Sequence, residues 1–485
     1  MRRLTAALAV LASVSGFFWS QKKEGGAACD RGCRVQVLGN GEWENGQSLE
    51  LSESDCAAPS LAKLVCARST LAGEGCALFT SVGIQVKSCT DIKADDFVHV
   101  VPAGRLFMWP SFEVGHKVEI KHLEGTATTE AHGPVVLETL SQRPRVFRLQ
   151  NFFSEAEAED LITHALSIED DTFRLKRSST GATGYTVDSK RTSEGAFDVN
   201  SPTAMNIKKR SFDLLGIRPY DESFADGIQI LRYNQTTAYI SHMDWIEPTK
   251  IGNDHDWDSA GDGTNRYATI LLYLSGVEDG GETVFTQAKP LSGAGSDGQG
   301  LVTKKQAEAE TSEYLEATNL TSLFPAGTWQ RSMIVECRSR MAIKPVKAEA
   351  LLFYSQFPDG RVDRLSIHGG CPVLIGQKWA ANLWVWNGPR NGYARKNPKT
   401  GKLERNTGPI SVSAAFDTQV DVGAKLFWQD QEWGPLVPGE SIRVNTYEGH
   451  KWTVRLNNEP ILEWTIGGDE QTQQFILTAE DVGVH

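Results

Sequence analysis

A histidine and a carboxylate one residue apart, His242 and Asp244, form the only His-x-Asp of the chain, and His368 follows far downstream. Because alternate residues of a strand point to the same face, this spacing predicts that His242 and Asp244 share one face of a β-strand. Two histidines and one carboxylate can hold a non-haem Fe(II) and leave three positions open for a chelating cosubstrate and O₂. His-x-Asp alone is a weak signal, since a polar triplet in a surface strand arises easily by chance.

A second cluster begins at His368 and reads His-Gly-Gly-Cys-Pro-Val-Leu-Ile-Gly-Gln-Lys-Trp. We expect His368 on one strand, Gly376 in a turn and Lys378 on the next strand, ten residues after the histidine (378 − 368 = 10). An ammonium on a long stem suits a single end-on charge, such as the distal carboxylate of a dicarboxylate that chelates the metal. Taken alone, Lys378 would be a solvated surface lysine; its spacing from the histidine favours the binding role.

Residues 144 to about 388 resemble the catalytic domain of the prolyl 4-hydroxylases, which are 2-oxoglutarate- and Fe(II)-dependent dioxygenases. The matching stretches occur in the order of that family and cover about half the chain. They are Pro144–Phe153 with a helix expected after Ser154, Arg191–Ser193, Gln229–Tyr233, Tyr239–Asp244, Arg266–Leu274, Gly280–Thr283, Cys337, Ile343–Pro345, Ala350–Phe353 and the His368 cluster. Together they are far more specific than the three ligands.

The resemblance implies roles for particular side chains. It implies that the iron ligands are His242, Asp244 and His368, that 2-oxoglutarate is bound by Lys378, Thr283 and Tyr233, that Arg266, Tyr239 and Trp384 line the peptide groove, and that Cys337 pairs with Cys371. A buried carboxylate does need a charge partner and polar donors. The alternatives are a strand threonine at Thr283, a core aromatic at Tyr233, and ordinary strand packing for the groove residues.

The resemblance also implies the fold and the reaction. The fold is mainly β with flanking helices, with the catalytic domain a double-stranded β-helix of jelly-roll type. The reaction is 4-hydroxylation of a peptidyl proline, coupled to decarboxylation of 2-oxoglutarate to succinate and CO₂. Fe(II), 2-oxoglutarate, O₂ and ascorbate are the implied cofactors. Two polar insertions, 250–265 and 291–330, depart from the family pattern and are expected to be surface loops beside the substrate groove.

The 485-residue chain is expected to contain several domains. They are a signal peptide or signal anchor (1–25), a cysteine-rich region (26–100), a short β-rich connecting segment (101–143), the catalytic domain (144–390) and a C-terminal β-sandwich (410–480). Whether the connecting segment packs on the catalytic domain is open. The apolar run near the N-terminus is shorter than a comfortable membrane span. A signal anchor at this end is the only membrane contact that the sequence suggests.

The cysteines favour the secretory pathway, with the endoplasmic reticulum lumen or membrane as the expected location. Six of the eight lie in the cysteine-rich region, where they predict three disulfides with 15 possible pairings. A zinc knuckle is the alternative, although no Cys-x₂-Cys pair is present. The sequons at Asn234 and Asn319 are glycosylation candidates, and Asn319 is the better one because Asn234 adjoins the expected cosubstrate pocket.

The C-terminal segment alternates apolar and polar residues as a small β-sandwich does. Its stretches Leu436–Gly439 and Thr446–Trp452 resemble the β-domain of the von Hippel-Lindau tumour suppressor, whose relatives read hydroxyproline. The resemblance makes Trp433, Thr446, His450 and Trp452 hydroxyproline-reader candidates. A sandwich that only braces the enzyme is the alternative.

The net charge of −12 argues against a nucleic-acid partner, and a proline-rich polypeptide is the expected substrate. Two other functions stay open. A sibling oxygenase such as a lysyl hydroxylase would share the ligands, and a non-catalytic hydroxyproline-binding protein would carry a degenerate oxygenase domain. The presence of every ligand residue argues against the second. The sequence leaves the oligomeric state open.

Overall fold

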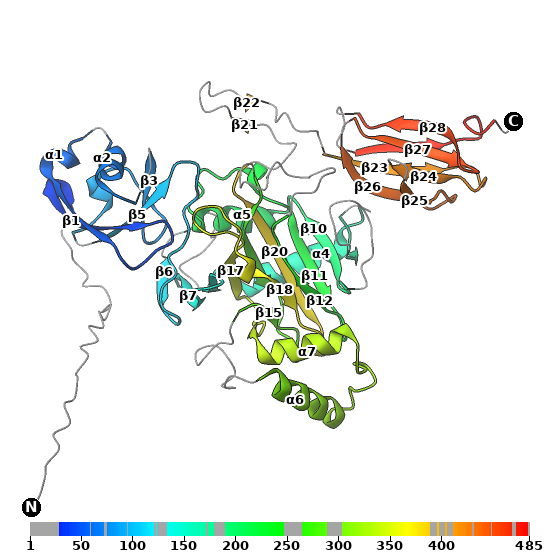
Figure 1. Ribbon diagram of the computed structural model, residues 1–485, viewed down its shortest axis with the longest axis horizontal. Coiled ribbons are helices and arrows are strands. Elements are labelled where there is room, and N and C mark those ends of the chain that lie inside the picture. Colours follow the sequence, from blue (N-terminus) through cyan, green and yellow to red (C-terminus); the bar gives the residue numbers. More distant parts are fainter. Residues whose placement is uncertain are drawn as a thin grey trace, which may run out of the picture.

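The computed structural model contains three regions in sequence order, and Figure 1 shows the first and last on opposite sides of a large central region. It describes the chain except for residues 1–28, 59, 72–74, 95, 121–122, 124–132, 171–172, 179–189, 247–263, 289–302, 389–394, 397–402, 405–410, 429–430, 448, 468–471 and 484–485. The expected signal segment therefore lies outside the described residues, as does nearly all of the insertion 250–265. Among the helices that are described, none is long and apolar enough to cross a membrane.

The cysteine-rich region is a small α+β unit around a five-stranded sheet with strand order β2-β1-β5-β3-β4. Its elements are β1 (Gly32–Gly39), β2 (Gln47–Ser52), α1 (Glu53–Cys56), α2 (Leu61–Arg68), β3 (Cys76–Thr80), β4 (Gln85–Val86), β5 (Phe97–Pro102) and two 3₁₀ turns, Cys29–Arg31 and Cys89–Asp91. Strands β1 and β5 run parallel in the middle of the sheet. The valines that alternate along them fill the core of the unit.

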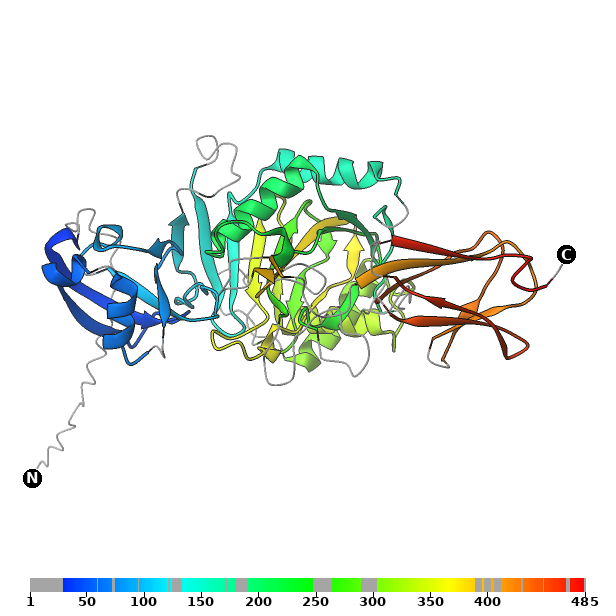
Figure 2. The same cartoon turned by 90° about the horizontal axis from the view of Figure 1, so that it is seen from above.

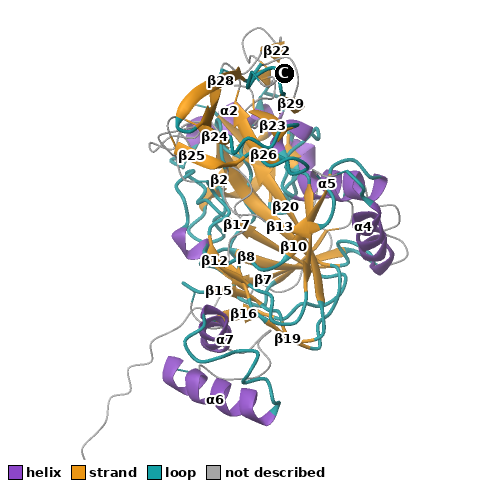
Figure 3. Cartoon of the chain, turned by 90° about the vertical axis from the view of Figure 1, so that its right-hand side faces the viewer, coloured by secondary structure: helices purple, strands orange, loops and turns teal. Residues whose placement is uncertain are grey.

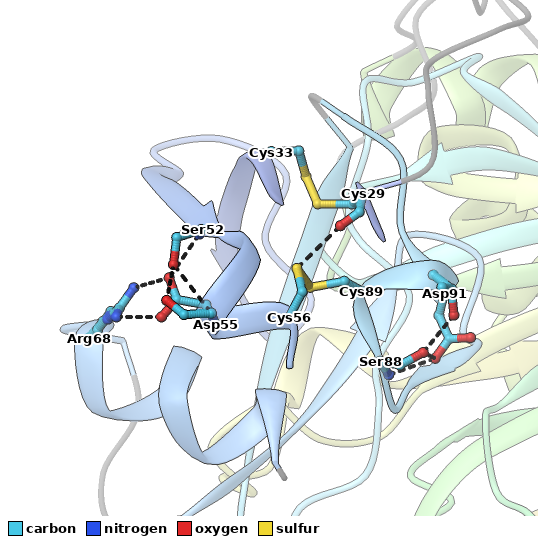
Figure 4. Close-up of a disulfide and its surroundings, with 11 residues drawn as sticks. Cys29, Cys33, Ser52, Asp55, Cys56, Arg68, Ser88, Cys89 and Asp91 are labelled. Atoms are coloured by element: carbon cyan, nitrogen blue, oxygen red, sulfur yellow. Dashed lines mark hydrogen bonds and ion pairs between the residues drawn. A yellow bond between two sulfur atoms is a disulfide. The ribbon is translucent and has the colours of Figure 1, made fainter. Parts of the chain in front are cut away.

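All six cysteines of this region are paired, which excludes the zinc knuckle. The disulfides are Cys29–Cys33, Cys56–Cys89 and Cys66–Cys76. Figure 4 shows the first two beside Asp55, which accepts two hydrogen bonds from Arg68, both at 2.8 Å. The disulfides tie α1 to the 3₁₀ turn at Cys89 and α2 to β3, so covalent links supplement a small core.

The central region is built on a nine-stranded sheet with strand order β6-β7-β8-β17-β13-β20-β11-β10-β9. The strands are β6 (Lys117–Ile120), β7 (Val135–Ser141), β8 (Val146–Gln150), β9 (Lys176–Arg177), β10 (Glu194–Asp198), β11 (Ile228–Tyr233), β13 (Arg266–Tyr273), β17 (Ala350–Tyr354) and β20 (Lys378–Trp386). Strands β6 and β7 come from the connecting segment, so this segment extends the catalytic sheet and is no separate module.

Two helices, α4 (Glu155–Ser167) and α5 (Pro202–Leu214), cover one face of this sheet, as Figure 3 shows from the side. Ser154 begins α4 as expected, because its hydroxyl accepts from Glu157 N–H and the Glu157 carboxylate accepts from Ser154 N–H. Apolar residues of both helices and of the sheet form the largest core of the protein.

The other face of the sheet packs against a four-stranded sheet with order β12-β18-β15-β16. Its strands are β12 (Tyr239–His242), β15 (Thr283–Phe285), β16 (Met341–Ile343) and β18 (His368–Gly370); β14 (Asp279–Gly280) and β19 (Val373–Ile375) pair nearby, and 3₁₀ turns occupy Glu222–Phe224 and Arg364–Ser366. Phe285 and Phe353 meet edge to face between the two sheets. The space between these sheets holds the candidate site.

The insertion 291–330 is not the loop that its polar composition predicted. It contains α6 (Lys304–Ala317), which Thr303 and Gln306 cap, and α7 (Trp329–Ser339) begins at its end. The two helices pack together through Leu315 and Ile334. The signal for a helix was the spacing of the apolar residues among Glu, Lys and Ala, which are strong helix formers. Composition alone does not show that spacing.

The C-terminal region contains a three-stranded sheet, β26-β23-β29, and a four-stranded sheet, β25-β24-β27-β28. The strands are β23 (Ser411–Thr418), β24 (Lys425–Trp428), β25 (Gln431–Pro435), β26 (Ile442–Tyr447), β27 (Lys451–Leu456), β28 (Glu459–Thr465) and β29 (Thr472–Leu477); β21 (Arg395–Lys396) and β22 (Leu403–Glu404) precede them. Both sheets contribute to one apolar core, and Figure 2 shows them as a separate body at the C-terminal end.

An ion pair joins helices α4 and α5 of the central region. Arg210 on α5 is 2 % exposed, donates to Glu157 at 2.8 Å and also donates to the Phe152 carbonyl at 2.6 Å. Glu157 also accepts the Ser154 N–H in the N-terminal cap of α4. Arg210 therefore connects the first turn of α4 to α5.

We expect Arg210→Met to lower the free energy of unfolding by roughly 3–5 kcal/mol, because it leaves a half-buried carboxylate without its cation. Urea unfolding followed by tryptophan fluorescence measures the change. Lys209→Met, on a more exposed position of the same helix, is the control and should change little. The double variant Glu157→Gln/Arg210→Met should recover part of the loss, and equal instability of the single and double variants would contradict the ion-pair explanation.

Candidate active site

The three expected metal ligands come together between the two sheets. His242 ends β12, His368 begins β18, and the antiparallel pairing of these strands sets the two histidines opposite each other. Asp244 lies two residues beyond the end of β12, in a bend, so it does not share a strand face with His242 as the spacing predicted. Its carboxylate oxygens nevertheless approach the Nε2 atoms of His242 and His368, each at 3.6 Å.

Hydrogen bonds select the form of both imidazoles that binds metals. His242 Nδ1 lies 2.9 Å from the Ile240 carbonyl, and His368 Nδ1 lies 3.0 Å from the Ser366 carbonyl. Because a carbonyl only accepts, each Nδ1 carries a proton, so in its neutral form each ring would present a bare Nε2 to the centre. Burial, reinforced by the neighbouring imidazole, lowers the pKa of His242 to about 3.

The carboxylate is held in its charged form. Asp244 is 4 % exposed, and Thr269 Oγ1 on β13 donates to its Oδ2 at 2.6 Å. Burial alone would raise the pKa of Asp244, but the two imidazoles, Arg266 and the Thr269 hydroxyl together keep it below its usual value. One ligand atom from each of the three residues lies within 4.8 Å of the others. Two neutral imidazoles and one carboxylate in this space fit a divalent metal such as Fe(II).

A buried ammonium lies at the start of β20. Lys378, the first residue of β20, is 3 % exposed, and its Nζ donates to the Gly281 carbonyl at 2.7 Å. The same nitrogen lies 5.4 Å from the centre of the Tyr233 ring and 5.4 Å from that of Tyr273. Burial lowers the pKa of Lys378 to about 8. A cation in this setting is suited to receive an anionic ligand group, which would offset its loss of hydration.

The other two cosubstrate candidates adjoin this lysine. Tyr233 ends β11 and pairs with Lys378 across the sheet, while Thr283 begins β15 and accepts a hydrogen bond from Tyr273 at 2.9 Å. The sequence reasoning assigned no role to Tyr273 or to Thr269. Their signal was the alternation along β13, since residues 269, 271 and 273 point to the same face of the strand.

The three groove candidates lie at the metal centre. The Arg266 guanidinium stacks 3.9 Å from the Trp384 ring centre, forms an ion pair with Asp226 at 3.1 Å and donates to the Asp244 carbonyl at 3.3 Å. The Tyr239 ring stacks on His242 with 3.7 Å between ring centres. These contacts are to protein groups, so each of the three also has a structural role beside the expected groove role.

A disulfide joins helix α7 to the segment that follows His368. Cys337 on α7 is joined to Cys371, three residues after His368, which is the pair that the family resemblance implied. Helix α7 also contacts β12, β15 and β16, and Met333 packs with Val284 and Cys371. Helix α7 therefore braces the sheet that carries both histidines.

The reader candidates also lie together, in the C-terminal region. Trp452 Nε1 donates to Thr446 Oγ1 at 3.1 Å, and Thr446 Oγ1 lies 3.0 Å from His450 Nδ1. Trp433 stands edge-on to Trp452 with 5.3 Å between ring centres. A residue that the sequence reasoning missed, Trp428, lies 5.3 Å from His450.

The central region is similar to known proteins. Residues 228–386 match the family described as the 2OG-Fe(II) oxygenase superfamily. Three relatives from Arabidopsis thaliana are probable prolyl 4-hydroxylase 9 (29% identical, covering 58% of this chain and 82% of the relative), probable prolyl 4-hydroxylase 4 (31%, 52% and 70%) and probable prolyl 4-hydroxylase 3 (32%, 51% and 71%).

Solved structures that match part of this chain include the viral collagen prolyl hydroxylase of Paramecium bursaria Chlorella virus-1, which is 18% identical. The match covers 50% of this chain and 95% of the viral chain, with a TM-score of 0.30. A prolyl-4-hydroxylase from Pseudomonas putida is 14% identical and covers 50% of this chain and 91% of its own, with a TM-score of 0.28.

We expect His242→Ala to weaken Mn(II) binding by more than about 100-fold, because losing a ligand costs more than losing an outer partner, which alone costs roughly 10- to 100-fold. Titration of free Mn(II) by electron paramagnetic resonance measures the affinity. His164→Ala removes a partly exposed histidine from α4 and should leave binding unchanged. Equal affinities for His242→Ala and the unaltered chain would place the metal elsewhere.

Proposed function

We propose that this chain, which belongs to the prolyl 4-hydroxylase family of 2-oxoglutarate- and Fe(II)-dependent oxygenases, hydroxylates a peptidyl proline at C4 and couples this to conversion of 2-oxoglutarate to succinate and CO₂. The observation that carries the proposal is the convergence of His242, Asp244 and His368 beside the buried Lys378. A ligand set alone would suit several metal sites. The ligand set with an internal cation suits a chelating dicarboxylate.

In the proposed mechanism His242 and His368 each offer Nε2 and Asp244 offers a carboxylate oxygen to the metal. Fe(II), with 2-oxoglutarate and O₂ bound, supplies the oxidising power for the C–H bond. The carbonyls of Ile240 and Ser366 keep the histidine protons on Nδ1, so the rings do not rotate away from the centre. Ascorbate, which would keep the iron reduced, is part of the same proposal.

Lys378 binds the far end of the cosubstrate in this proposal. A carboxylate at its Nζ would replace lost hydration with a charge-assisted hydrogen bond. The Tyr273 hydroxyl already donates to Thr283, so the Thr283 hydroxyl keeps its own proton available for the same carboxylate. Tyr233 closes the pocket from the neighbouring strand.

The proposed substrate is a proline-rich polypeptide of the secretory pathway. Support comes from the four disulfides, which form in oxidising compartments, and from the exposure of Asn319 in its sequon. Expression in eukaryotic cells tests the location. A glycosidase-sensitive shift that Asn319→Gln abolishes would support it, and an unglycosylated cytosolic product with free thiols would overturn it.

We further propose that residues 410–480 form a β-sandwich similar to the von Hippel-Lindau β-domain and bind hydroxyproline. If Thr446 donates to His450 Nδ1, the neutral imidazole carries its proton on Nε2 and can donate to a ligand hydroxyl. Binding of matched hydroxyproline and proline peptides to the full chain tests this, with His450→Ala as the variant. Equal binding of the two peptides would contradict hydroxyproline recognition and would favour a purely structural role for residues 410–480.

The decisive experiment for the oxygenase is succinate release by the full chain with Fe(II), ascorbate and 2-oxoglutarate, with and without poly-proline and Pro-Pro-Gly peptides. We expect peptide-stimulated turnover, with one added oxygen atom on proline, and its loss in His242→Ala. Oxidation of lysine in place of proline would support the sibling oxygenase. Absence of turnover together with selective binding of hydroxyproline peptides would support the non-catalytic alternative.

The low pKa of Lys378 predicts a pH dependence of cosubstrate binding. The dicarboxylate binds when Lys378 is protonated and therefore positively charged. The affinity for 2-oxoglutarate is therefore full well below pH 8 and falls as the pH rises through the lysine pKa of about 8. We expect 2-oxoglutarate to bind about tenfold more weakly at pH 9 than at pH 7. Calorimetric titration of the Mn(II)-loaded protein measures this.

Lys378→Arg is the matched control, because a guanidinium keeps its charge throughout this range. Its affinity for 2-oxoglutarate should not change between pH 7 and pH 9, whatever its absolute value. An equally flat profile in the unaltered chain would show that Lys378 does not titrate there or does not contact the cosubstrate.

A further inference from the structure

A hydroxyl on the central strand of the large sheet is bound to the carboxylate at the metal centre. Thr269 Oγ1 lies 2.6 Å from Asp244 Oδ2, and the two residues are 1 % and 4 % exposed. A hydrogen bond from a hydroxyl to a charged carboxylate is short and strong, and at this burial water does not compete for it.

The two partners differ in how firmly the fold holds them. Thr269 lies in the middle of β13, paired with Phe353 on β17 and with Trp384 on β20. Asp244 lies in a bend beyond the end of β12, where Arg266 donates to its main-chain carbonyl. The hydrogen bond therefore joins the metal ligand on the less regular segment to a side chain on one of the most constrained strands.

The bond also distinguishes the two carboxylate oxygens. Oδ2 accepts the Thr269 proton and lies 3.6 Å from His368 Nε2, whereas Oδ1 lies 3.6 Å from His242 Nε2. A lone pair engaged by a strong donor is less available to a metal, so Oδ1 is the better ligand. This matters because a carboxylate that bound through both oxygens would occupy a fourth position of an octahedral metal, and a chelating cosubstrate and O₂ need three.

We infer that Thr269 is a positioning residue that keeps Asp244 bound to the metal through a single oxygen. The inference rests on the proposed function, since it assumes that His242, Asp244 and His368 hold a metal. According to this inference, Thr269 affects the affinity and the coordination of the metal. An ordinary strand threonine with a hydrogen-bonded hydroxyl would affect neither.

The test compares Thr269→Val, which keeps the shape and removes the donor, with Thr269→Ser, which keeps the donor. Thr418→Val, at a buried threonine of the C-terminal region whose hydroxyl donates to Val420, is the matched control. The readouts are Mn(II) affinity, the visible absorption spectrum of the Co(II)-loaded protein and the melting temperature, all without peptide.

We expect Thr269→Val to bind Mn(II) roughly 10- to 100-fold more weakly and to change the Co(II) spectrum. Thr269→Ser should restore both, and Thr418→Val should match the unaltered chain. Unchanged affinity and spectrum in Thr269→Val would overturn the inference. So would a Thr269→Ser variant that is as defective as Thr269→Val, because that result would indicate a packing role.

The outcomes separate this inference from the proposed function. If the unaltered chain binds metal and loses it in His242→Ala, the site stands, and the threonine variants decide the inference alone. If the unaltered chain binds no metal, both fail. Should Thr269→Val not fold, Thr269→Ala takes its place, because a smaller side chain introduces no clash, and its comparison with Thr269→Ser decides in the same way.

Discussion

The pairing of β12 with β18 is the interaction on which the active site depends. It places His242 opposite His368, although 126 residues separate them in the chain (368 − 242 = 126). Main-chain hydrogen bonds hold this pairing, and local carbonyls orient both rings, so the ligand geometry belongs to the protein itself. The Cys337–Cys371 disulfide and helix α7 then hold the smaller sheet from its far side. The position of the candidate metal ligands therefore depends on the β12–β18 pair, which α7 and the disulfide stabilise.

Much of the central fold could be predicted from the sequence, for identifiable reasons. Strands β11 and β17 lie on the matching stretches Gln229–Tyr233 and Ala350–Phe353, because each stretch is mostly apolar and is covered on both faces. Helix α4 begins where Ser154 and Glu157 form a capping box, and Gly376 has the positive φ of the turn expected before Lys378. In these places a local physical preference and the final fold agree, which is where sequence reasoning is dependable.

The remaining features depend on tertiary contacts that no local pattern contains. Asp244 leaves the strand that carries His242, yet the fold returns its carboxylate to the metal centre through Thr269 and Arg266. A further short strand, β19, intervenes between His368 and Lys378. Helix α6 was not predicted in the polar insertion because its few apolar residues pack into a small cluster with residues of α7 and β19. The three pairings in the cysteine-rich region follow from chain proximity in space, which spacing along the sequence does not determine.

The burial of Lys378 has a consequence for how the proposed reaction ends. Succinate keeps the distal carboxylate of 2-oxoglutarate, while loss of CO₂ turns the chelating α-keto acid end into a simple carboxylate. The product would therefore keep its contact with the buried ammonium and lose only the chelate on the metal. A cation in so enclosed a pocket has little water to replace a departing anion. The lysine that recruits the cosubstrate would therefore also delay the exit of what remains of it. Succinate would compete with 2-oxoglutarate for the same pocket, and the turnover of the protein would respond to the ratio of the two acids in its compartment.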